Sequence, residues 1–377
     1  MANSEVIDQS FMRQAIQLAE LGRYTTTPNP NVGCLIVAGQ RIIGRGFHQQ
    51  AGAPHAEVYA LQQAGCQAAG ATAYVTLEPC SHYGKTPPCA DALIKAKIKR
   101  VVIAMQDPNP QVAGKGIQRL RESGINVTVG VMADKAASIN RGFLKRMTQK
   151  KPWLTTKLAS SLDGKTALSN GKSQWITGEQ ARLDVHKLRA EYCAILTGAD
   201  TILVDDPKLN VRLESNTIYP PELSQRLLRQ PTKVIIDSQN RLTAEHQIFQ
   251  MAGDVIVANT HNNPNLSPNF PMLADVTQWQ IPRVGQYLSL DVLVEKLAEQ
   301  GFNNVWCEAG AKLNGALLNA ELIDELIVYQ APKLMGAMAR PLFDLPEFET
   351  MDAIPQFEIE ALSTVGKDIK MVLHPKA

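Results

Sequence analysis

The sequence predicts an α/β protein of two domains, each built on a mostly parallel sheet with helices on its faces. The chain has 377 residues, which is more than a single hydrophobic core usually serves. Short apolar runs alternate along it with stretches of helical spacing, the pattern of a parallel sheet with crossover helices. A basic segment at residues 145–152 ends in a proline and interrupts this alternation. We therefore expect one domain at residues 1–150 and a second at 151–377.

In the first domain, short apolar runs predict strands and helical spacing precedes each of them. The expected strands lie at residues 34–38, 73–77, 101–104 and 125–129. The expected helices lie at residues 11–21, 57–64, 90–96 and 114–124. This alternation favours a mostly parallel sheet that helices cover on both faces.

A second series of apolar runs begins after Pro152 and predicts the strands of the second domain. The runs lie at residues 153–159, 194–197, 233–236, 255–258, 305–307, 326–329 and 371–373. The region 259–284 is rich in Asn and Pro, which predicts an excursion over the surface. After the strand at 305–307, residues 310–315 lead into a helix expected at 316–320.

The composition is that of an ordinary globular protein and argues against several classes. Hydrophobic residues make up 45% of the chain and charged residues 20%, with no bias towards disorder. A formal charge of +2 is too balanced for binding nucleic acid or a membrane surface through bulk charge. No run approaches the roughly 20 apolar residues of a membrane span, and the N-terminus lacks a signal-peptide pattern. Six cysteines in so long a chain do not indicate a disulfide framework, so we expect a cytoplasmic protein.

His55, Cys80 and Cys89 form a candidate zinc site. The segment Pro54-His55-Ala56-Glu57 opens a predicted helix, with proline at the favoured first position. Cys80 follows a strand, and Cys89 opens the next helix. One imidazole and two thiolates are three zinc ligands, which leaves the fourth tetrahedral position open for water, as in catalytic sites. Zinc there would lower the pKa of the water towards ~7 and supply hydroxide.

Glu57 is the candidate general acid and base of this site. From the first turn of the helix its carboxylate could carry a proton from the water to a ring nitrogen and on to departing ammonia. That is its role in zinc deaminases with an H-x-E…P-C-x-x-C pattern. The cysteines here are separated by eight residues rather than two. A pair at that spacing also fits a structural zinc or two thiols without a metal, so both interpretations stay open at this point.

Three nearby residues are candidates for binding substrate. Asn29 lies in a Pro/Asn segment before the first strand, where its amide could recognise a pyrimidine edge; an ordinary turn is the alternative. His82 and Lys85 lie in the loop between the two cysteines and are candidates to contact the substrate and its phosphate. Solvated loop side chains are the alternative for both.

Seven motifs, spread over nearly the whole chain, together resemble the bifunctional deaminase–reductases of riboflavin biosynthesis. In that family the eight-residue spacing between the cysteines is the expected one. The motifs are T-P-N-P-N-V-G (27–33), H-A-E (55–57), E-P-C-S-H-Y-G-K-T-P-P-C (78–89), K-L-A-S-S-L-D-G-K-T-A (157–167), S-Q-W-I-T (173–177), D-D-P-K-L-N-V-R (205–212) and E-A-G-A-K-L-N-G-A-L-L (308–318).

The resemblance implies two folds and two sequential reactions. The N-terminal domain would be an α/β/α sandwich similar to cytidine deaminases, with one Zn²⁺. The C-terminal domain would be similar to dihydrofolate reductase and bind NADPH. The first reaction would hydrolyse the 2-amino group of 2,5-diamino-6-(5-phosphoribosylamino)pyrimidin-4-one to a carbonyl. The second would reduce the ribosyl side chain of 5-amino-6-(5-phosphoribosylamino)uracil to ribityl.

The resemblance also implies the residues of the reductase site. Those expected to contact NADPH are Ala159, Trp175, Thr201, Asp205, Ser238, Gly310, Ala311, Lys312, Leu313, Asn314, Gly315 and Ala316. Those expected to contact substrate are Ser173, Arg189, Leu209, Arg212 and Glu308.

Residue chemistry supports part of this reductase assignment. The guanidinium forks of Arg189 and Arg212 suit phosphate oxygens, although surface ion pairs are the alternative. No G-x-G-x-x-G follows a strand, so a Rossmann site has no support. Instead, the glycine-rich 310–315 segment could direct a helix N-terminus at a cofactor phosphate, and a plain glycine turn is the alternative.

Lys157 and Asp205 are candidates for positioning or proton donation in the reductase step. A lysine at a strand edge and an aspartate in a turn are the alternatives for these two residues. Ser238 and Arg241 could hold a 2′-phosphate of the cofactor, although alone they are an ordinary turn serine and a solvated arginine.

Two rival functions remain at this stage. One is a deaminase of nucleosides or tRNA whose second half only binds, which the weak net charge does not favour. The other is a zinc-stabilised binding protein without turnover, which would not need Glu57 beside its metal. We expect a small pyrimidine nucleotide as the ligand, no nucleic-acid or membrane partner, and a homodimer, the commonest oligomer.

Overall fold

The computed structural model describes residues 2–81, 83, 87–109, 113–225, 227–267 and 271–376. The chain forms two compact units. The first contains residues 1–150 together with the segment Tyr219–Leu227, and the second contains residues 151–218 and 228–377. Within the described chain, no helix combines the length and the hydropathy that crossing a bilayer requires.

The first unit is built on a five-stranded sheet with the order β2-β1-β3-β4-β5. Its strands are β1 (Gly33–Ala38), β2 (Arg41–Phe47), β3 (Thr72–Val75), β4 (Arg100–Ile103) and β5 (Asn126–Val129). β3, β4 and β5 are parallel, as predicted. β1 pairs antiparallel with both β2 and β3, because the unpredicted β2 returns directly from β1 as a hairpin.

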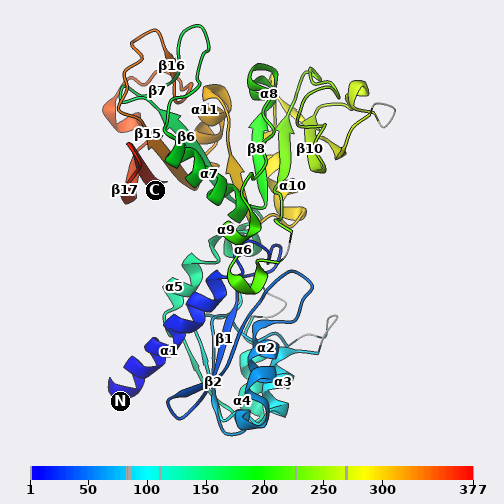
Figure 1. Ribbon diagram of the computed structural model, residues 1–377, viewed down its shortest axis with the longest axis vertical. Coiled ribbons are helices and arrows are strands. Elements are labelled where there is room, and N and C mark those ends of the chain that lie inside the picture. The colour runs from blue at the N-terminus through cyan, green and yellow to red at the C-terminus, as the bar shows by residue number, and fades with distance from the viewer. Residues whose placement is uncertain are drawn as a thin grey trace. The chain divides into compact units, whose positions relative to one another are not determined.

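Helices cover both faces of this sheet, which makes the unit an α/β/α sandwich (Figure 1). Alternate residues of β1 enter different cores: Cys34 and Ile36 face α2, α3 and α4, whereas Leu35 and Val37 face α1 and α5. The helices are α1 (Ala2–Glu20), α2 (Ala56–Ala64), α3 (Cys89–Lys95), α4 (Lys115–Glu122), α5 (Ala133–Ser138) and α6 (Arg141–Gln149), with a 3₁₀ turn η1 at Gly65–Ala68.

The second unit is built on a nine-stranded sheet with the order β11-β10-β9-β8-β14-β6-β15-β18-β17. The first seven strands in that order are mutually parallel, and β18 and β17 are antiparallel additions. The strands are β6 (Trp153–Ser160), β8 (Ala194–Gly198), β9 (Thr232–Ile236), β10 (Gly253–Asn259), β11 (Ala274–Gln280), β14 (Asn304–Cys307), β15 (Glu325–Gln330), β17 (Phe357–Val365) and β18 (Asp368–Pro375).

Two hydrophobic cores flank this sheet. α10 and α11 pack on one face, while α7 and α8 pack on the other (Figure 1). The helices are α7 (Glu179–Glu191), α8 (Ala199–Asp205), α9 (Ser215–Ile218), α10 (Leu290–Glu299) and α11 (Ala311–Asn319). Short elements complete the chain: β7 (Lys165–Ala167) with β16 (Arg340–Pro341), β12 (Arg283–Val284) with β13 (Tyr287–Leu288), and 3₁₀ turns η2 (Pro221–Leu223), η3 (Pro264–Leu266) and η4 (Met351–Ala353).

The structure corrects three sequence-based expectations in the second unit. The region 259–284 is not only an excursion, because β11 runs through it as an edge strand parallel to β10. The last strand of the sheet, β17, has no apolar run to mark it and alternates polar and apolar residues. Helix α11 begins at Ala311 rather than at residue 316, so residues 311–315 are helical and not a loop.

Candidate functional sites

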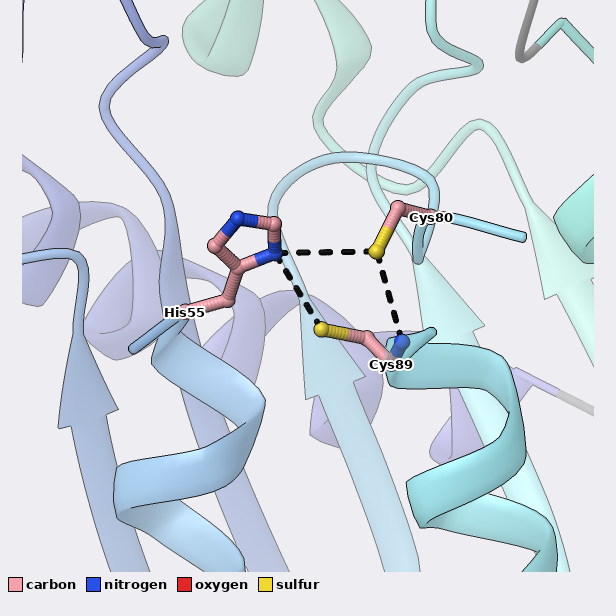
Figure 2. Close-up of side chains that lie close together, drawn as sticks. All are labelled: His55, Cys80 and Cys89. Carbon is pink, nitrogen blue, oxygen red and sulfur yellow. Dashed lines mark hydrogen bonds between the residues drawn. The ribbon is translucent and has the colours of Figure 1, made fainter. Parts of the chain in front are cut away.

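The three predicted zinc ligands converge in the first unit (Figure 2). Nδ1 of His55 lies 3.6 Å from Sγ of Cys80 and 3.3 Å from Sγ of Cys89. All three ligand atoms lie within 4.8 Å of one another. Two sulfurs and one imidazole nitrogen at this separation suit a tetrahedral zinc with one position left for water. The donor set therefore fits the predicted metal.

Local structure fixes these ligands at the ends of secondary-structure elements. His55 is the N-cap residue of α2, and Cys89 is the first residue of α3. The sequence predicted that Pro54 is the first residue of the helix. In the structure Pro54 instead precedes the N-cap residue His55. Cys80 lies in the loop after β3, and its Sγ accepts a hydrogen bond from the backbone N–H of Cys89 at 3.3 Å. Helix N-termini stabilise negative charge, so the N-terminus of α3 favours the thiolate of Cys80, whose sulfur accepts the first N–H of that helix.

Hydrogen bonding shifts the pKa values of the two cysteines in opposite directions. The hydrogen bond from Cys89 lowers the pKa of the Cys80 thiol to about 4, and His55 contributes in the same direction. The same hydrogen bond, followed by burial, raises the pKa of Cys89. The hydrogen bond with Cys80 raises the pKa of His55. The lowered pKa favours the thiolate of Cys80, which is the form in which a cysteine binds a metal.

Glu57 lies in the first turn of α2 and is only 3% exposed. Burial raises the pKa of its carboxyl group, while the neighbouring His55 opposes that shift. Its side chain also contacts Cys89 by a hydrogen bond. A buried acid this close to two ligands has no evident role in a purely structural zinc site, which favours the catalytic interpretation.

Glu78 is a buried anchor that the sequence analysis did not single out. Its carboxylate, 4% exposed as a residue, accepts four backbone hydrogen bonds. The donors are the N–H groups of Asp107 at 3.3 Å, Gly114 at 2.9 Å, Gly116 at 2.9 Å and Ile117 at 3.1 Å. Glu78 thus ties the N-terminus of α4 to the loop that presents Cys80. In the sequence, only its position two residues before Cys80 points to a role for Glu78 near the metal ligands.

Asn29 contacts His48, which in turn contacts the zinc ligand His55. Nδ2 of Asn29 lies 3.0 Å from Nε2 of His48, whose ring meets that of His55 edge-on with centroids 5.4 Å apart. Asn31, in contrast, exchanges hydrogen bonds with Asn140 and holds the loop. The other two candidates, His82 and Lys85, lie outside the described residues.

In the second unit, four of the predicted cofactor residues lie at one edge of the sheet. β9, β8, β14 and β6 are neighbours and parallel, so their carboxyl ends meet there. Ser238, Thr201 and Gly310 follow β9, β8 and β14, and Ala159 lies near the end of β6. Ligands of open α/β sheets bind at this edge, so the topology favours a shared cofactor site.

The N-terminus of α11 is a candidate phosphate-binding element at that edge. Its N-cap is Gly310, which is exposed and has open space where a Cβ would stand. A phosphate could therefore approach the N–H groups of Ala311, Lys312 and Leu313. Ala316 is exposed one turn later.

Two of the predicted cofactor residues in α11 face inward. Asn314 is 1% exposed and donates to the carbonyl of Ala309 at 3.0 Å. A Cβ added to Gly315 would lie 2.0 Å from the carbonyl oxygen of Asp344, so Gly315 permits close packing. For these two residues the geometry favours a structural role over cofactor contact.

Ser173 and Trp175 lie on a loop that neighbouring side chains hold in place. The Trp175 ring is 63% exposed, and the guanidinium of Arg182 lies over it at 4.5 Å. Nζ of Lys333 donates to the Trp175 carbonyl at 2.8 Å.

Arg241, a candidate for the 2′-phosphate of the cofactor, lies nearer the cofactor edge. It forms an ion pair with Asp200 at 2.7 Å, so its charge is already neutralised by a carboxylate.

Arg189, Glu308 and Lys157 form a charged cluster. Arg189 and Glu308 make a bidentate ion pair with distances of 2.5 and 2.8 Å. Trp306 donates to the same carboxylate at 2.8 Å. Burial alone would raise the pKa of Glu308, but Arg189 outweighs it and lowers that pKa to about 2. Burial lowers the pKa of Lys157, against the opposing charge of Glu308.

Arg212 extends this cluster towards solvent, but Asp205 is not brought into it. Arg189 donates to the Asn210 carbonyl and Arg212 to the Asn210 side chain, both at 3.2 Å. Leu209 is 3% exposed and anchors the segment below them. Asp205 ends α8 at the surface, where burial raises its pKa and the charge of Arg340 opposes that shift.

His186 is a further member of this cluster, which the sequence analysis missed. It lies three residues before Arg189 on α7, and its Nδ1 accepts from the backbone N–H of Arg212 at 3.4 Å. Burial, followed by the charges of the two arginines, lowers its pKa to about 4. In the sequence, its position three residues before Arg189 predicts that the two side chains lie on the same face of a helix.

Comparison with known proteins identifies both domains. Residues 5–105 match the cytidine and deoxycytidylate deaminase zinc-binding region, and residues 152–371 match the RibD C-terminal domain. The chain is 51% identical to the riboflavin biosynthesis protein RibD of Escherichia coli, over 96% of this chain and 98% of that one. It is 48% identical to RibD of Haemophilus influenzae, over 98% of each chain.

Solved structures extend the agreement to three dimensions. Acinetobacter baumannii RibD superposes with a TM-score of 0.90 at 45% identity, covering 99% of this chain and all of that one. A Thermotoga maritima protein superposes with a TM-score of 0.85 at 32% identity, with 99% and 100% of the chains covered. It is described as a diaminohydroxyphosphoribosylaminopyrimidine deaminase/5-amino-6-(5-phosphoribosylamino)uracil reductase.

Proposed function

The chain belongs to the RibD family of bifunctional deaminase–reductases of riboflavin biosynthesis, and on that premise we propose which residues carry its two reactions. The deaminase domain uses zinc and the reductase domain uses NADPH. Its substrates on this proposal are those for which the Thermotoga relative is named. A nucleoside or tRNA deaminase with a merely binding second half is disfavoured, because residues 152–371 match the reductase domain.

For the deaminase, we propose that His55, Cys80 and Cys89 hold the zinc. Bound there, zinc supplies a hydroxide nucleophile at neutral pH by lowering the pKa of water. Glu57 accepts one proton of the attacking water and passes it to the pyrimidine ring nitrogen. It then takes the proton of the newly added hydroxyl group and gives it to the departing amine. Ammonia leaves and a carbonyl takes its place. Asn29 is proposed to bind the pyrimidine, together with His82 and Lys85 in the following loop.

The observation that carries this proposal is the buried carboxylate of Glu57 beside three converging ligand atoms. We expect Glu57→Gln to keep its zinc and to lose ammonia release by at least roughly a hundredfold, the usual contribution of a general acid–base. Zinc content and ammonia release from the diaminopyrimidine nucleotide are measured on the same preparation.

NADPH oxidation with 5-amino-6-(5-phosphoribosylamino)uracil should be unchanged in Glu57→Gln, since that reaction follows deamination. Glu122→Gln, at an exposed position in α4, is the matched control and should keep both activities. Ammonia release by Glu57→Gln at the wild-type rate would refute the mechanism.

For the reductase, we propose that the substrate phosphate binds Arg189 and Arg212, and that Ser173, Leu209 and Glu308 complete the substrate site. The cofactor would lie along the edge formed by β9, β8, β14 and β6, with a phosphate at the N-terminus of α11. NADPH, when bound, supplies the hydride that reduces the ribosyl carbon to ribityl. Lys157 is proposed to donate or position the accompanying proton, because it lies next to Glu308 and Arg189.

The remaining cofactor contacts stay proposals of the same kind. They are Ala159, Trp175, Thr201, Asp205, Ser238 and residues 310–316, of which Asn314 and Gly315 have the least structural support. Asp205 is retained as a cofactor contact and as a second candidate for proton donation.

We also propose that the protein is a cytoplasmic homodimer. All six cysteines are among the described residues and form no disulfide, which suits a reducing compartment. Strand β17 closes one end of the nine-stranded sheet and exposes Ile359 and Leu362 by 61% and 65%. Exposed apolar side chains on an edge strand favour pairing with another copy.

A further inference from the structure

His186 lies where α7 meets the segment 209–212, and this junction is rigidly built. The segment is anchored at Leu209 and Val211, which are 3% and 4% exposed. Gln230 binds both backbone groups of Val211: its Oε1 accepts from the N–H at 2.9 Å and its Nε2 donates to the carbonyl at 3.2 Å. The next N–H, that of Arg212, donates to Nδ1 of His186 at 3.4 Å.

The charges around His186 leave an excess of positive charge. Arg189 and Arg212 are two cations beside His186, and Glu308 is the carboxylate that opposes them. Lys157 adds a third cation beside Arg189 and Glu308. Glu308 is already taken by the bidentate pair with Arg189. Burial and then the charge of Arg189 lower the pKa of Arg212. The second cause shows that the two guanidinium groups still repel each other. Such a cluster is stabilised by a bound anion.

The hydrogen bond from Arg212 also fixes the tautomer of the imidazole. Because Nδ1 accepts, the proton of a neutral His186 lies on Nε2. Burial, and after it the charges of Arg189 and Arg212, lower the pKa of His186 to about 4, against a weaker opposing hydrogen bond with the Asn210 backbone. The ring is therefore neutral at pH 7, and its one N–H donor lies beside the Asn210 carbonyl and the two guanidinium groups that share Asn210.

We propose that His186 is a third phosphate-binding residue of the reductase site: its Nε2–H donates to a phosphate oxygen of the nucleotide while its Nδ1 holds the backbone of Arg212. This inference rests on the proposed function, in which Arg189 and Arg212 bind that phosphate. A neutral donor adds a hydrogen bond without adding to the repulsion between the cations.

Two substitutions separate the two nitrogens of the ring. His186→Asn keeps an acceptor near the position of Nδ1 and removes the donor at Nε2. His186→Gln places an amide donor near the position of Nε2. Lys187→Gln, at the exposed neighbouring position of the same helix, is the matched control for a general loss of polar or charged groups. Thermal unfolding and NADPH binding show whether each variant is folded.

The readouts are the dissociation constant of ribose 5-phosphate by calorimetry, and KM and kcat for the nucleotide and for its dephosphorylated nucleoside. We expect His186→Asn to weaken ribose 5-phosphate binding and to raise the nucleotide KM roughly tenfold or more, the effect of losing a hydrogen bond to a charged group. The nucleoside KM should not move, and His186→Gln should recover most of the lost affinity. Lys187→Gln should behave as wild type.

The outcomes distinguish this inference from the proposed function. If Arg212→Gln loses ribose 5-phosphate affinity and His186→Asn does not, the role of His186 is wrong and the phosphate site stands. If neither substitution matters, nor Arg189→Gln, the phosphate site itself is misassigned and the inference is wrong with it. Equal KM increases for nucleotide and nucleoside would show that His186 only shapes the backbone, and would overturn the proposal.

Discussion

His55 and Glu57 differ in role because of their positions at the start of one helix. His55 is the N-cap and has an extended backbone, so its ring projects away from the helix towards the two sulfurs. Glu57 is already helical and its side chain is buried beside the cap. Two residues of one short motif thereby provide a metal ligand and a proton carrier at a shared point in space.

At neutral pH, His186 should make little contribution to the stability of the second unit, but it should destabilise that unit in mild acid. Its pKa is about 4 in the folded protein, below its ordinary value of 6.5. The unfolded chain therefore binds the proton first as the pH falls below about 6.5. Stability is lost progressively down to about pH 4, by about 1–2 kcal/mol after allowing for solvent screening.

Urea unfolding followed by tryptophan fluorescence checks this pH dependence, because all four tryptophans lie in the second unit. The free energy of unfolding of His186→Gln minus that of the wild type should grow as the pH is lowered from 7 to 4.5. Parallel curves for the two proteins would contradict the burial of a neutral imidazole. Lys187→Gln again serves as the control.

At the scale of elements, Glu78 joins a strand-end loop to a helix. Its two carboxylate oxygens accept four N–H groups around the start of α4. Glu78→Gln replaces one of these acceptors by an amide donor that faces N–H groups. We expect a loss of about 1–3 kcal/mol in the free energy of unfolding of the first unit, together with easier removal of zinc by a chelator.

Circular dichroism melts and chelator titrations measure these two effects of Glu78→Gln. Glu122→Gln removes the same charge from the exposed end of α4 and should stay within about 0.5 kcal/mol of wild type. If the two variants melt together, Glu78 does not stabilise the junction.

The strands that sequence analysis found are mainly the central ones of both sheets. A strand buried on both faces is apolar over most of its length, as β14 and β8 are, and such runs are visible in a sequence. β2, β11 and β17 are edge strands, and each interleaves polar or glycine residues that solvent or a bulge accommodates. Their pairing is decided by tertiary contacts, so the local pattern did not reveal them.

Some residues of the candidate sites could be predicted from the sequence and others could not. His55, Glu57, Cys80 and Cys89 were predictable because metal chemistry restricts the residue types and their order. His186 and Glu78 were not, because an ordinary helix histidine and an ordinary loop glutamate become significant only through partners far along the chain.

At the scale of the whole molecule, the proposed homodimer gives a direct prediction. The measured mass in solution should be about twice the 41.3 kDa of the chain. Leu362→Arg, on the exposed edge strand β17, should shift the protein towards monomer, because a charge on an edge opposes strand pairing.

Light scattering coupled to size exclusion measures the mass. The control is Val284→Arg, at a position that is 68% exposed outside that strand. A dimer that survives Leu362→Arg would mean that another surface joins the two copies.

The segment Tyr219–Leu227 lies in the middle of the reductase sequence but belongs to the first compact unit, where the rings of Tyr24 and Tyr219 meet at 5.9 Å. A single cut after codon 150 would therefore separate this segment from the unit in which it packs. A deaminase expressed from that fragment lacks nine residues of its own fold and leaves Tyr24 without its aromatic neighbour. A deaminase fragment that ends at residue 150 should therefore be less stable than the same unit in the full chain, and adding the segment back should restore part of that stability.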